Sequence, residues 1–411
     1  MRRLSILFTI TVLFSGLIRA GGFQVGLQGQ RQTGMGLIGT GYLTGPSSVF
    51  YNPGAMGYQN SMYNFSLGVS PIISDVSFQY EAPSLYEATT DNPVSTPFNF
   101  YGSGKITDKL SAGLGVYTPY GSSTVWGDDW RGRHIIQDIS LLSVYVQPTL
   151  SYNVSDRFGI GAGFVVAYGQ VELNKGFPLQ NFDGEEGQIN LQGSTIGYGF
   201  NAGFFARPTD GWELGVTYRS EVLMEVQGGD AAFTVPTSLR GTSFPVENEF
   251  DADLPLPASV NFGTSYRLSD KVKLGVDVNY VFWSSYESLD FDFETNTESL
   301  DDISQPKNYE DGLIYRIGGE YFVNNIWTLR AGFYYDSPVV DDEYYAPETP
   351  DAVKLGFTGG LTYKPNERLA VDASFLYVKG LERTVNYKPE NFGGTYKYSG
   401  LVPGIGINYK F

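Results

Sequence analysis

The chain has 411 residues, a formal net charge of -17 at pH 7 and no cysteine. This acidity argues against nucleic-acid binding, which requires basic patches, and the lack of cysteine excludes disulfides, cysteine-based metal sites and a lipoprotein anchor. Glycine (51 residues), tyrosine (30) and phenylalanine (28) are abundant, yet the mean hydropathy is -0.17. This combination is typical of strands that are apolar on one face only.

The first twenty residues have the order of a secretory signal peptide. Arg2 and Arg3 precede an apolar run over residues 4–13, and small residues then lead to Ala20. Exported proteins lose a leader of this kind by cleavage. The run is too short for a membrane-spanning helix, which needs about 20 apolar residues. We therefore expect residues 1–20 to be a signal peptide that is cleaved after Ala20.

Residues 21–60 follow neither the period of a helix nor that of a strand. Glycine recurs throughout the segment, as at Gly34, Gly36, Gly39, Gly41 and Gly45. Irregular backbone is tolerated at membrane depth only where protein or a water-filled cavity surrounds it. The lumen of a wide barrel is also too large for side chains alone to fill. We expect residues 21–60 to form a compact plug, the hatch, inside a barrel built from residues 61–411.

From residue 61 onward the chain alternates between apolar and polar residues. The clearest stretch is the C-terminus, where the odd positions are Leu401, Pro403, Ile405, Ile407, Tyr409 and Phe411. The same period of two recurs near 142–152, 212–218, 272–282, 327–335 and 353–363. It predicts strands with one buried face, and each run is close to the 9–11 residues of a tilted transmembrane strand. The terminal Phe411 resembles the signal that barrel-insertion machinery recognises.

The connections between these strands alternate in length. Short turns fall near 155–157, 269–270, 324–325 and 365–367, and long polar connections run roughly over 174–194, 227–254, 290–307, 337–351 and 386–394. Short turns at one end and long loops at the other are typical of bacterial outer-membrane barrels. Counting the strands gives an all-β, 14-stranded antiparallel transmembrane barrel in the bacterial outer membrane. A water-soluble all-β protein is the alternative.

Several motifs resemble one family. Gly22-Phe23-Gln24 and Asn52-Pro53-Gly54 are similar to the hatch of the long-chain fatty acid transporter (FadL) family of outer-membrane proteins, although that family usually has Ala where this chain has Gly54. Further matches follow in the family's order: Tyr120-Gly121 with Trp130 and Arg131, Tyr218-Arg219-Ser220-Glu221-Val222, Leu254-Pro255-Leu256-Pro257, Trp283-Ser284-Ser285-Tyr286, Tyr315-Arg316-Ile317, and Leu329-Arg330-Ala331-Gly332 through Asp336-Ser337-Pro338-Val339.

The resemblance implies a monomeric barrel that the hatch closes and that takes up hydrophobic small molecules such as fatty acids or hydrocarbons. The ligand would enter from outside, bind in the lumen and leave sideways into the membrane lipid through a gap in the wall. An apolar solute gains about 0.8 kcal/mol per buried CH₂, so a wall gap would deliver it directly to hydrocarbon.

In this family the gap comes from an inward kink in the third strand. The matching residues here are Tyr117, Thr118, Pro119, Tyr120 and Gly121. Pro119 cannot donate to a strand ladder and Gly121 has no side chain to pack, so pairing is expected to break there. The alternative is an ordinary strand end that runs into a loop.

An anionic head group would need a cation in the lumen. Four basic residues fall on the inward face of their strands, namely Arg219, Arg316, Arg330 and Lys354, and a guanidinium binds a carboxylate bidentately. Four acidic residues point inward by the same count, namely Glu213, Asp277, Glu320 and Asp372. Ion pairs that brace the lumen are therefore the alternative to a ligand site.

Catalysis and metal binding find little support in the sequence. His134 is the only histidine, and neither a Gly-x-Ser-x-Gly elbow nor a metal-ligand spacing occurs. The run Gly159-x-Gly161-x-Gly163 favours close strand packing over phosphate binding, and Asp183, Glu185 and Glu186 favour a solvated surface over a Ca²⁺ site. We expect no enzyme activity, cofactor or metal. The rival functions are a general porin for polar solutes, which would lack a plug, and an outer-membrane lipase, which the single loop histidine argues against.

Overall fold

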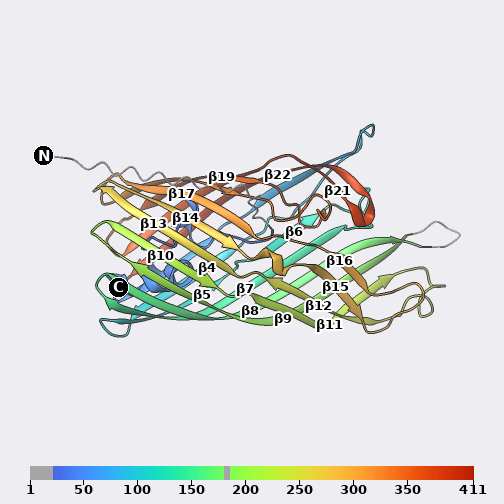
Figure 1. The fold of residues 1–411 in the computed structure, drawn as a ribbon, viewed down its shortest axis with the longest axis horizontal. Coiled ribbons are helices and arrows are strands. Elements are labelled where there is room, and N and C mark those ends of the chain that lie inside the picture. Colours follow the sequence, from blue (N-terminus) through green and yellow to red (C-terminus); the bar gives the residue numbers. More distant parts are fainter. Residues whose placement is uncertain (1–21, 180–185) are drawn as a thin grey trace.

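The strands close into a single barrel in the computed structural model, which describes residues 22–179 and 186–411 (Figure 1). The predicted signal peptide over residues 1–20 lies outside the described residues, as do Asp183 and Glu185. Fourteen strands, each antiparallel to its neighbours, follow one another around the described ring. They are β1 (Tyr63–Val69), β4 (Phe98–Lys105), β5 (Leu110–Tyr117), β7 (Asp138–Ser155), β8 (Phe158–Pro178), β9 (Glu186–Ala206), β10 (Trp212–Arg219), β13 (Ser259–Ser269), β14 (Val272–Val281), β17 (Gly312–Phe322), β18 (Trp327–Asp336), β19 (Lys354–Tyr363), β20 (Leu369–Gly380) and β22 (Phe392–Lys410).

The ring closes where the last strand pairs with the first. Leu67 of β1 lies opposite Ile407 of β22, and Val69 lies opposite Ile405. The predicted 14-stranded antiparallel barrel is therefore confirmed. The C-terminus lies at the end of the barrel that carries the short turns (Figure 1), which is the end expected to face the periplasm.

The other strands extend the wall at the opposite end. They are β2 (Ile73–Tyr80), β3 (Glu87–Thr89), β6 (Gly121–Val125), β11 (Val222–Thr234), β12 (Asn248–Leu256), β15 (Ser288–Phe293), β16 (Ile303–Pro306) and β21 (Arg383–Tyr387). The sequence prediction of long loops over 227–254, 290–307 and 386–394 was therefore wrong in part, as was the loop predicted over 174–194, because much of each stretch is strand. In β12 the outward residues Glu249 and Asp251 are charged while Phe250 is buried. A strand without an apolar outer face resembles a loop in sequence.

The outer face of the ring is apolar, as the alternation predicted. In β22, Ile405 is 57% exposed and Ile407 is 49% exposed, whereas the intervening Gly406 is buried and Val402 is 3% exposed. The even-numbered residues of this strand therefore face the lumen and the odd-numbered residues face outward.

The hatch segment over residues 22–60 packs against the inward face of the wall. It contains four short helical turns: α1 (Gln30–Thr33), η1 (Gly45–Ser47), α2 (Ser48–Tyr51) and η2 (Pro53–Tyr58). None of the helices in the described residues is long and apolar enough to cross a bilayer. Nearly all residues from 27 to 57 are buried, and in Figure 1 this dark blue segment runs within the ring of strands.

Glycines on both surfaces allow the hatch to approach the wall closely. A Cβ atom on Gly36, whose φ is +75°, would lie 2.5 Å from the carbonyl oxygen of Ile317. On the wall side, a Cβ on Gly332 would collide with the backbone of Gly36. Since no side chain fits between these backbones, the abundance of glycine in hatch and strands has a common cause.

We predict that Ile405→Arg impairs folding far more than Leu268→Arg. Both side chains are more than half exposed on the outer face, but Ile405 lies six residues before the chain end and Leu268 adjoins the turn after β13. Arginine on the lipid face costs about 2–4 kcal/mol at the bilayer midplane and about 0–1 kcal/mol near its edges. Heat-modifiable migration after refolding into vesicles measures the difference, and equal yields for both variants would contradict the assigned membrane depth.

Candidate functional site

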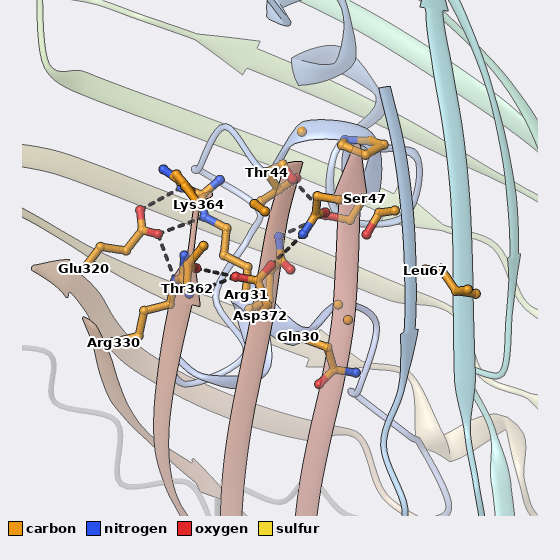
Figure 2. A pocket seen from close by; sticks show the side chains of 18 of the residues that line it. Gln30, Arg31, Thr44, Ser47, Leu67, Glu320, Arg330, Thr362, Lys364 and Asp372 are labelled. Carbon is orange, nitrogen blue, oxygen red and sulfur yellow. Dashed lines mark hydrogen bonds and ion pairs between the residues drawn. The ribbon is translucent and has the colours of Figure 1, made fainter. Parts of the chain in front are cut away.

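Glu320 of β17 anchors the hatch to the wall by an ion pair. Its two carboxylate oxygens accept hydrogen bonds from Arg31 Nε at 2.9 Å and Nη2 at 2.7 Å, and from the Tyr42 hydroxyl at 3.0 Å. Arg330 of β18 donates to the same carboxylate at 2.9 Å, and a second nitrogen lies 3.3 Å from Asp372 (Figure 2). Four charged side chains are therefore linked at the hatch–wall boundary, and Arg330 is engaged in the bracing that was the alternative to ligand binding.

Two further wall carboxylates hold the backbone of the hatch. Asp277 of β14 accepts from the backbone nitrogens of Gly39 at 2.7 Å and Thr40 at 2.9 Å. Glu213 of β10 accepts from Leu43 N at 3.1 Å and also pairs with Lys273 at 2.5 Å. A buried backbone N–H without a partner is costly, so these carboxylates stabilise the stretch of the hatch between α1 and η1, whose amides at Gly39, Thr40 and Leu43 bond to the wall. Sequence analysis missed this role, because the partner amides carry no signature in the sequence.

The Asn52-Pro53-Gly54 motif fixes the turn that leads to β1. The Asn52 side chain is fully buried, donates to Thr40 O at 2.8 Å and Phe204 O at 3.0 Å, and accepts from Gly54 N at 3.0 Å. A Cβ on Gly54 would lie 2.8 Å from the carbonyl oxygens of Gly159 and Gly203. This close approach explains why the chain has glycine at position 54. The glycine run that begins at Gly159 thus makes room for the hatch.

The third strand breaks at the predicted place. Tyr117, the last residue of β5, pairs with Tyr145, and Gly121, the first of β6, pairs with Leu142. Between these two pairs the third strand advances by four residues while β7 advances by three. The third strand therefore has one extra residue here, as in a β-bulge. The break lies at Thr118, Pro119 and Tyr120.

The hatch takes the place of the missing wall neighbour at this break. On the β4 side, regular pairing ends with Asn99 opposite Tyr117. Val25 N then donates to Pro119 O at 2.7 Å, and Gly121 N donates to Phe23 O at 3.0 Å. The third strand bonds again to the backbone between β3 and β4 only at Val125, whose carbonyl oxygen accepts from Asp91 N. Between Tyr117 and Val125, in the part of the chain that the structure describes, the start of the hatch therefore lies against the third strand in place of β4.

An aromatic cluster surrounds Phe23 at the break. Its ring centroid lies 4.9 Å from that of Trp283, 6.0 Å from Tyr286 and 6.2 Å from Tyr120. Phe23, Tyr120 and Gly121 also line an apolar cavity of about 40 Å³, together with Leu141, Met224, Val226, Leu254 and Leu256. The cavity lies directly beside the residues whose pairing is broken.

One apolar cluster extends from the hatch to the outer strand extensions. Trp126 and Trp130 stack with their centroids 4.5 Å apart, and Phe78 and Tyr396 pack around them. The connection between β18 and β19, predicted as a polar extracellular loop, folds inward onto this cluster. Its residue Tyr345 is buried against Tyr396, and the carbonyl oxygen of Pro347 accepts from Trp126 Nε1 at 3.0 Å.

The four predicted inward cations do not converge on one place. Arg219 and Arg316 line the same small polar cavity of about 30 Å³ beside the hatch. Arg219 donates to the Tyr117 hydroxyl at 2.8 Å and to Phe50 O at 3.2 Å, whereas the buried Nε of Arg316 has no hydrogen-bond partner. Neither Arg219 nor Arg316 forms an ion pair with a carboxylate in the part of the chain that the structure describes. Lys354 lies elsewhere, 3.3 Å from the carbonyl oxygen of Gly22.

The single histidine is half-buried. His134 Nε2 is 3.2 Å from Glu186, which also binds Arg133 at 2.5 Å. Hydrogen bonds from Arg133 lower the pKa of the Glu186 carboxyl to about 2. Within residues 22–179 and 186–411 no group of three acidic or histidine side chains is arranged to hold a metal ion.

The chain resembles proteins of known family over nearly its whole length. Residues 11–411 match the family described as outer membrane protein transport protein (OMPP1/FadL/TodX). The long-chain fatty acid transport protein of Escherichia coli K12 is 22% identical, over 84% of both chains. A Pseudomonas aeruginosa FadL homologue superposes with a TM-score of 0.85 at 20% identity, covering 95% of this chain and all of that one. The Pseudomonas putida toluene transporter TodX superposes with a TM-score of 0.74 at 18% identity, covering 96% of this chain and 99% of that one. The chain therefore belongs to the OMPP1/FadL/TodX family of outer membrane transport proteins.

Proposed function

We propose that this protein carries hydrophobic small molecules, such as long-chain fatty acids or hydrocarbons, across the outer membrane and releases them sideways through the wall at Pro119. The observation that carries the proposal is the apolar cavity that adjoins the strand break. Named relatives support it, since one is a fatty acid transport protein and one similar structure is a toluene transporter.

The proposed route follows the apolar part of the lumen. A ligand would pass the cluster around Trp126, reach the cavity at Phe23 and leave between Thr118 and Val125. Its free energy falls as its CH₂ groups leave water, by about 0.8 kcal/mol each, and it stays low in the hydrocarbon of the membrane. The hatch would serve as a plug against polar solutes, which distinguishes this function from that of a general porin.

Arg219 and Arg316 would bind the head group of an acidic ligand. They line one cavity, they form no ion pair with a described residue, and Arg316 has an unpartnered Nε. A carboxylate would satisfy this nitrogen with a charge-assisted hydrogen bond. An uncharged hydrocarbon would not use these two residues.

We predict that deleting residues 22–60 of the mature protein opens the barrel to polar solutes. The hatch is bound to the inner wall at Glu320, Asp277 and Glu213, so its loss should leave a wide aqueous pore. Liposomes with the deletion variant should swell rapidly in sugar solutions and show a large rise in single-channel conductance. Liposomes with the intact protein should not swell, and rapid swelling with it would favour the porin.

We predict that Pro119→Val combined with Gly121→Val stops uptake while binding persists. Valine at position 119 restores a ladder donor, and both changes favour a continuous strand. Uptake of a labelled fatty acid by cells should fall several-fold, whereas binding to the purified protein should stay within about twofold. The matched control is Pro403→Val on the outer face of β22. Normal uptake by a correctly inserted double variant would place the exit elsewhere.

We predict that Arg219→Gln weakens fatty acid binding selectively. Loss of a hydrogen bond to a charged group costs about 1.5–3 kcal/mol, which is roughly a tenfold to hundredfold loss of affinity. Binding of an uncharged hydrocarbon of the same length should change little. Arg240→Gln, an exposed position in the connection between β11 and β12, is the control. An equal loss for both ligands would show that Arg219 has a structural role only.

A further inference from the structure

A second cleft lies at the barrel end that carries the short turns, away from the proposed route. It has a volume of about 560 Å³ and runs between the turns at 325–326 and 364–368, the start of β1 and the end of β22. Residue Pro46 of the hatch forms its inner edge. We call it the rim cleft.

Three basic side chains line the rim cleft without a partner. Lys364, Arg368 and Lys410 all border it, and their side chains form no hydrogen bond or ion pair with any residue in the described ranges. The adjacent chamber of about 230 Å³ shares Lys364 with the rim cleft (Figure 2). There Glu320 pairs with Arg31 and Arg330, whereas Lys364, at the boundary between the chamber and the rim cleft, forms no ion pair with a described residue.

The charge of the rim cleft is opposite to that of the chain. Its lining contains one carboxylate, Glu367, against three cations, whereas the whole chain carries -17. The terminal carboxylate of Phe411 adjoins Lys410 but is outside the lining of the cleft, and it accepts a hydrogen bond from Met62 N at 3.2 Å. The rim cleft is therefore a local positive site that suits an anion.

The rim cleft borders the apolar outer wall. Phe65, Leu369 and Tyr409 line it, and the rings of Phe65 and Tyr409 each pack edge-on against Phe411, at centroid distances of 6.2 and 4.8 Å. Four amide side chains complete the lining, those of Asn64, Asn325, Asn366 and Asn408. An anion bound here would be in contact with polar donors on one side and with the membrane edge on the other.

We propose that the rim cleft binds the phosphate head group of an anionic phospholipid in the periplasmic leaflet of the outer membrane. The three cations would contact the phosphate, the amides the polar head, and Phe65 and Tyr409 the start of the acyl chains. Basic pockets at the membrane surface bind anionic lipid in this way. The proposal requires the barrel to span the membrane but is independent of what the lumen carries.

Native mass spectrometry of the full-length protein in detergent, titrated with phosphatidylglycerol, tests the proposal. The variant Lys364→Gln with Arg368→Gln and Lys410→Gln should bind the lipid at least about tenfold more weakly, since each surface cation contributes to anionic lipid binding. The matched control is Lys105→Gln with Lys109→Gln and Lys271→Gln. These three lysines lie at the same end but outside the rim cleft, and the control should bind as the unchanged protein does.

Three outcomes would overturn the proposal. One is an equal loss in both triple variants, which would reflect net charge alone. Another is no saturable binding of phosphatidylglycerol to the unchanged protein. The third is that inorganic phosphate, or glycerol 3-phosphate, competes at the concentration at which the lipid itself binds, which would mark a site for free phosphate. Heat-modifiable migration verifies folding, and Arg368→Gln alone, in an exposed turn, tests the same contact if the triple variant misfolds.

Discussion

The hydrogen-bonding needs of an irregular chain inside a membrane barrel determine much of this structure. In hydrocarbon an unsatisfied backbone group costs several kcal/mol, so non-helical backbone persists at that depth only where protein surrounds it. The hatch meets this constraint through wall carboxylates. Asp277 accepts two of its amides, Glu213 accepts a third, and Glu320 binds its arginine. Hatch and barrel are therefore complementary surfaces, and neither is satisfied without the other.

The same contact links the hatch to the broken strand. On the β4 side Pro119 and Gly121 have no strand neighbour, and their backbone groups pair with Val25 and Phe23 instead. The break is thus stabilised by the hatch, and the first residues of the hatch are positioned by the break. A displacement of Phe23 would expose both the apolar cavity that it lines and the edge that it pairs with, so under the proposed function a ligand in the cavity would act directly on the wall.

The sequence predicted features that repeat and missed those that join distant residues. The alternation of apolar and polar residues predicted the strands, their number in the ring and the outward orientation of Ile405, because lipid imposes the same pattern on every strand. The outer extensions were missed because β12 alternates charged residues with buried Phe250, and an outer face in water carries no apolar signal. The hatch anchors were missed because Gly39 and Asp277 lie 238 positions apart and pair through a backbone amide. The motif around Pro119 located the break, since proline and glycine disrupt pairing by their own chemistry.

The two halves of the lumen differ in how strongly they resist an apolar solute. To pass straight to the periplasm, it would have to separate the pairs that Glu320 makes with Arg31 and Arg330, and breaking a buried pair costs about 3–5 kcal/mol. To leave at the break, it would have to move Phe23 from its aromatic neighbours and displace two backbone hydrogen bonds, at Pro119 and Gly121, each with a net contribution of about 0.5–1.5 kcal/mol. Lipid on the far side of the break also solvates an apolar solute, whereas water beyond the hatch does not. Under the proposed function the destination would therefore favour the sideways route, and the charged layer that holds the hatch in place would add to the barrier of the straight route.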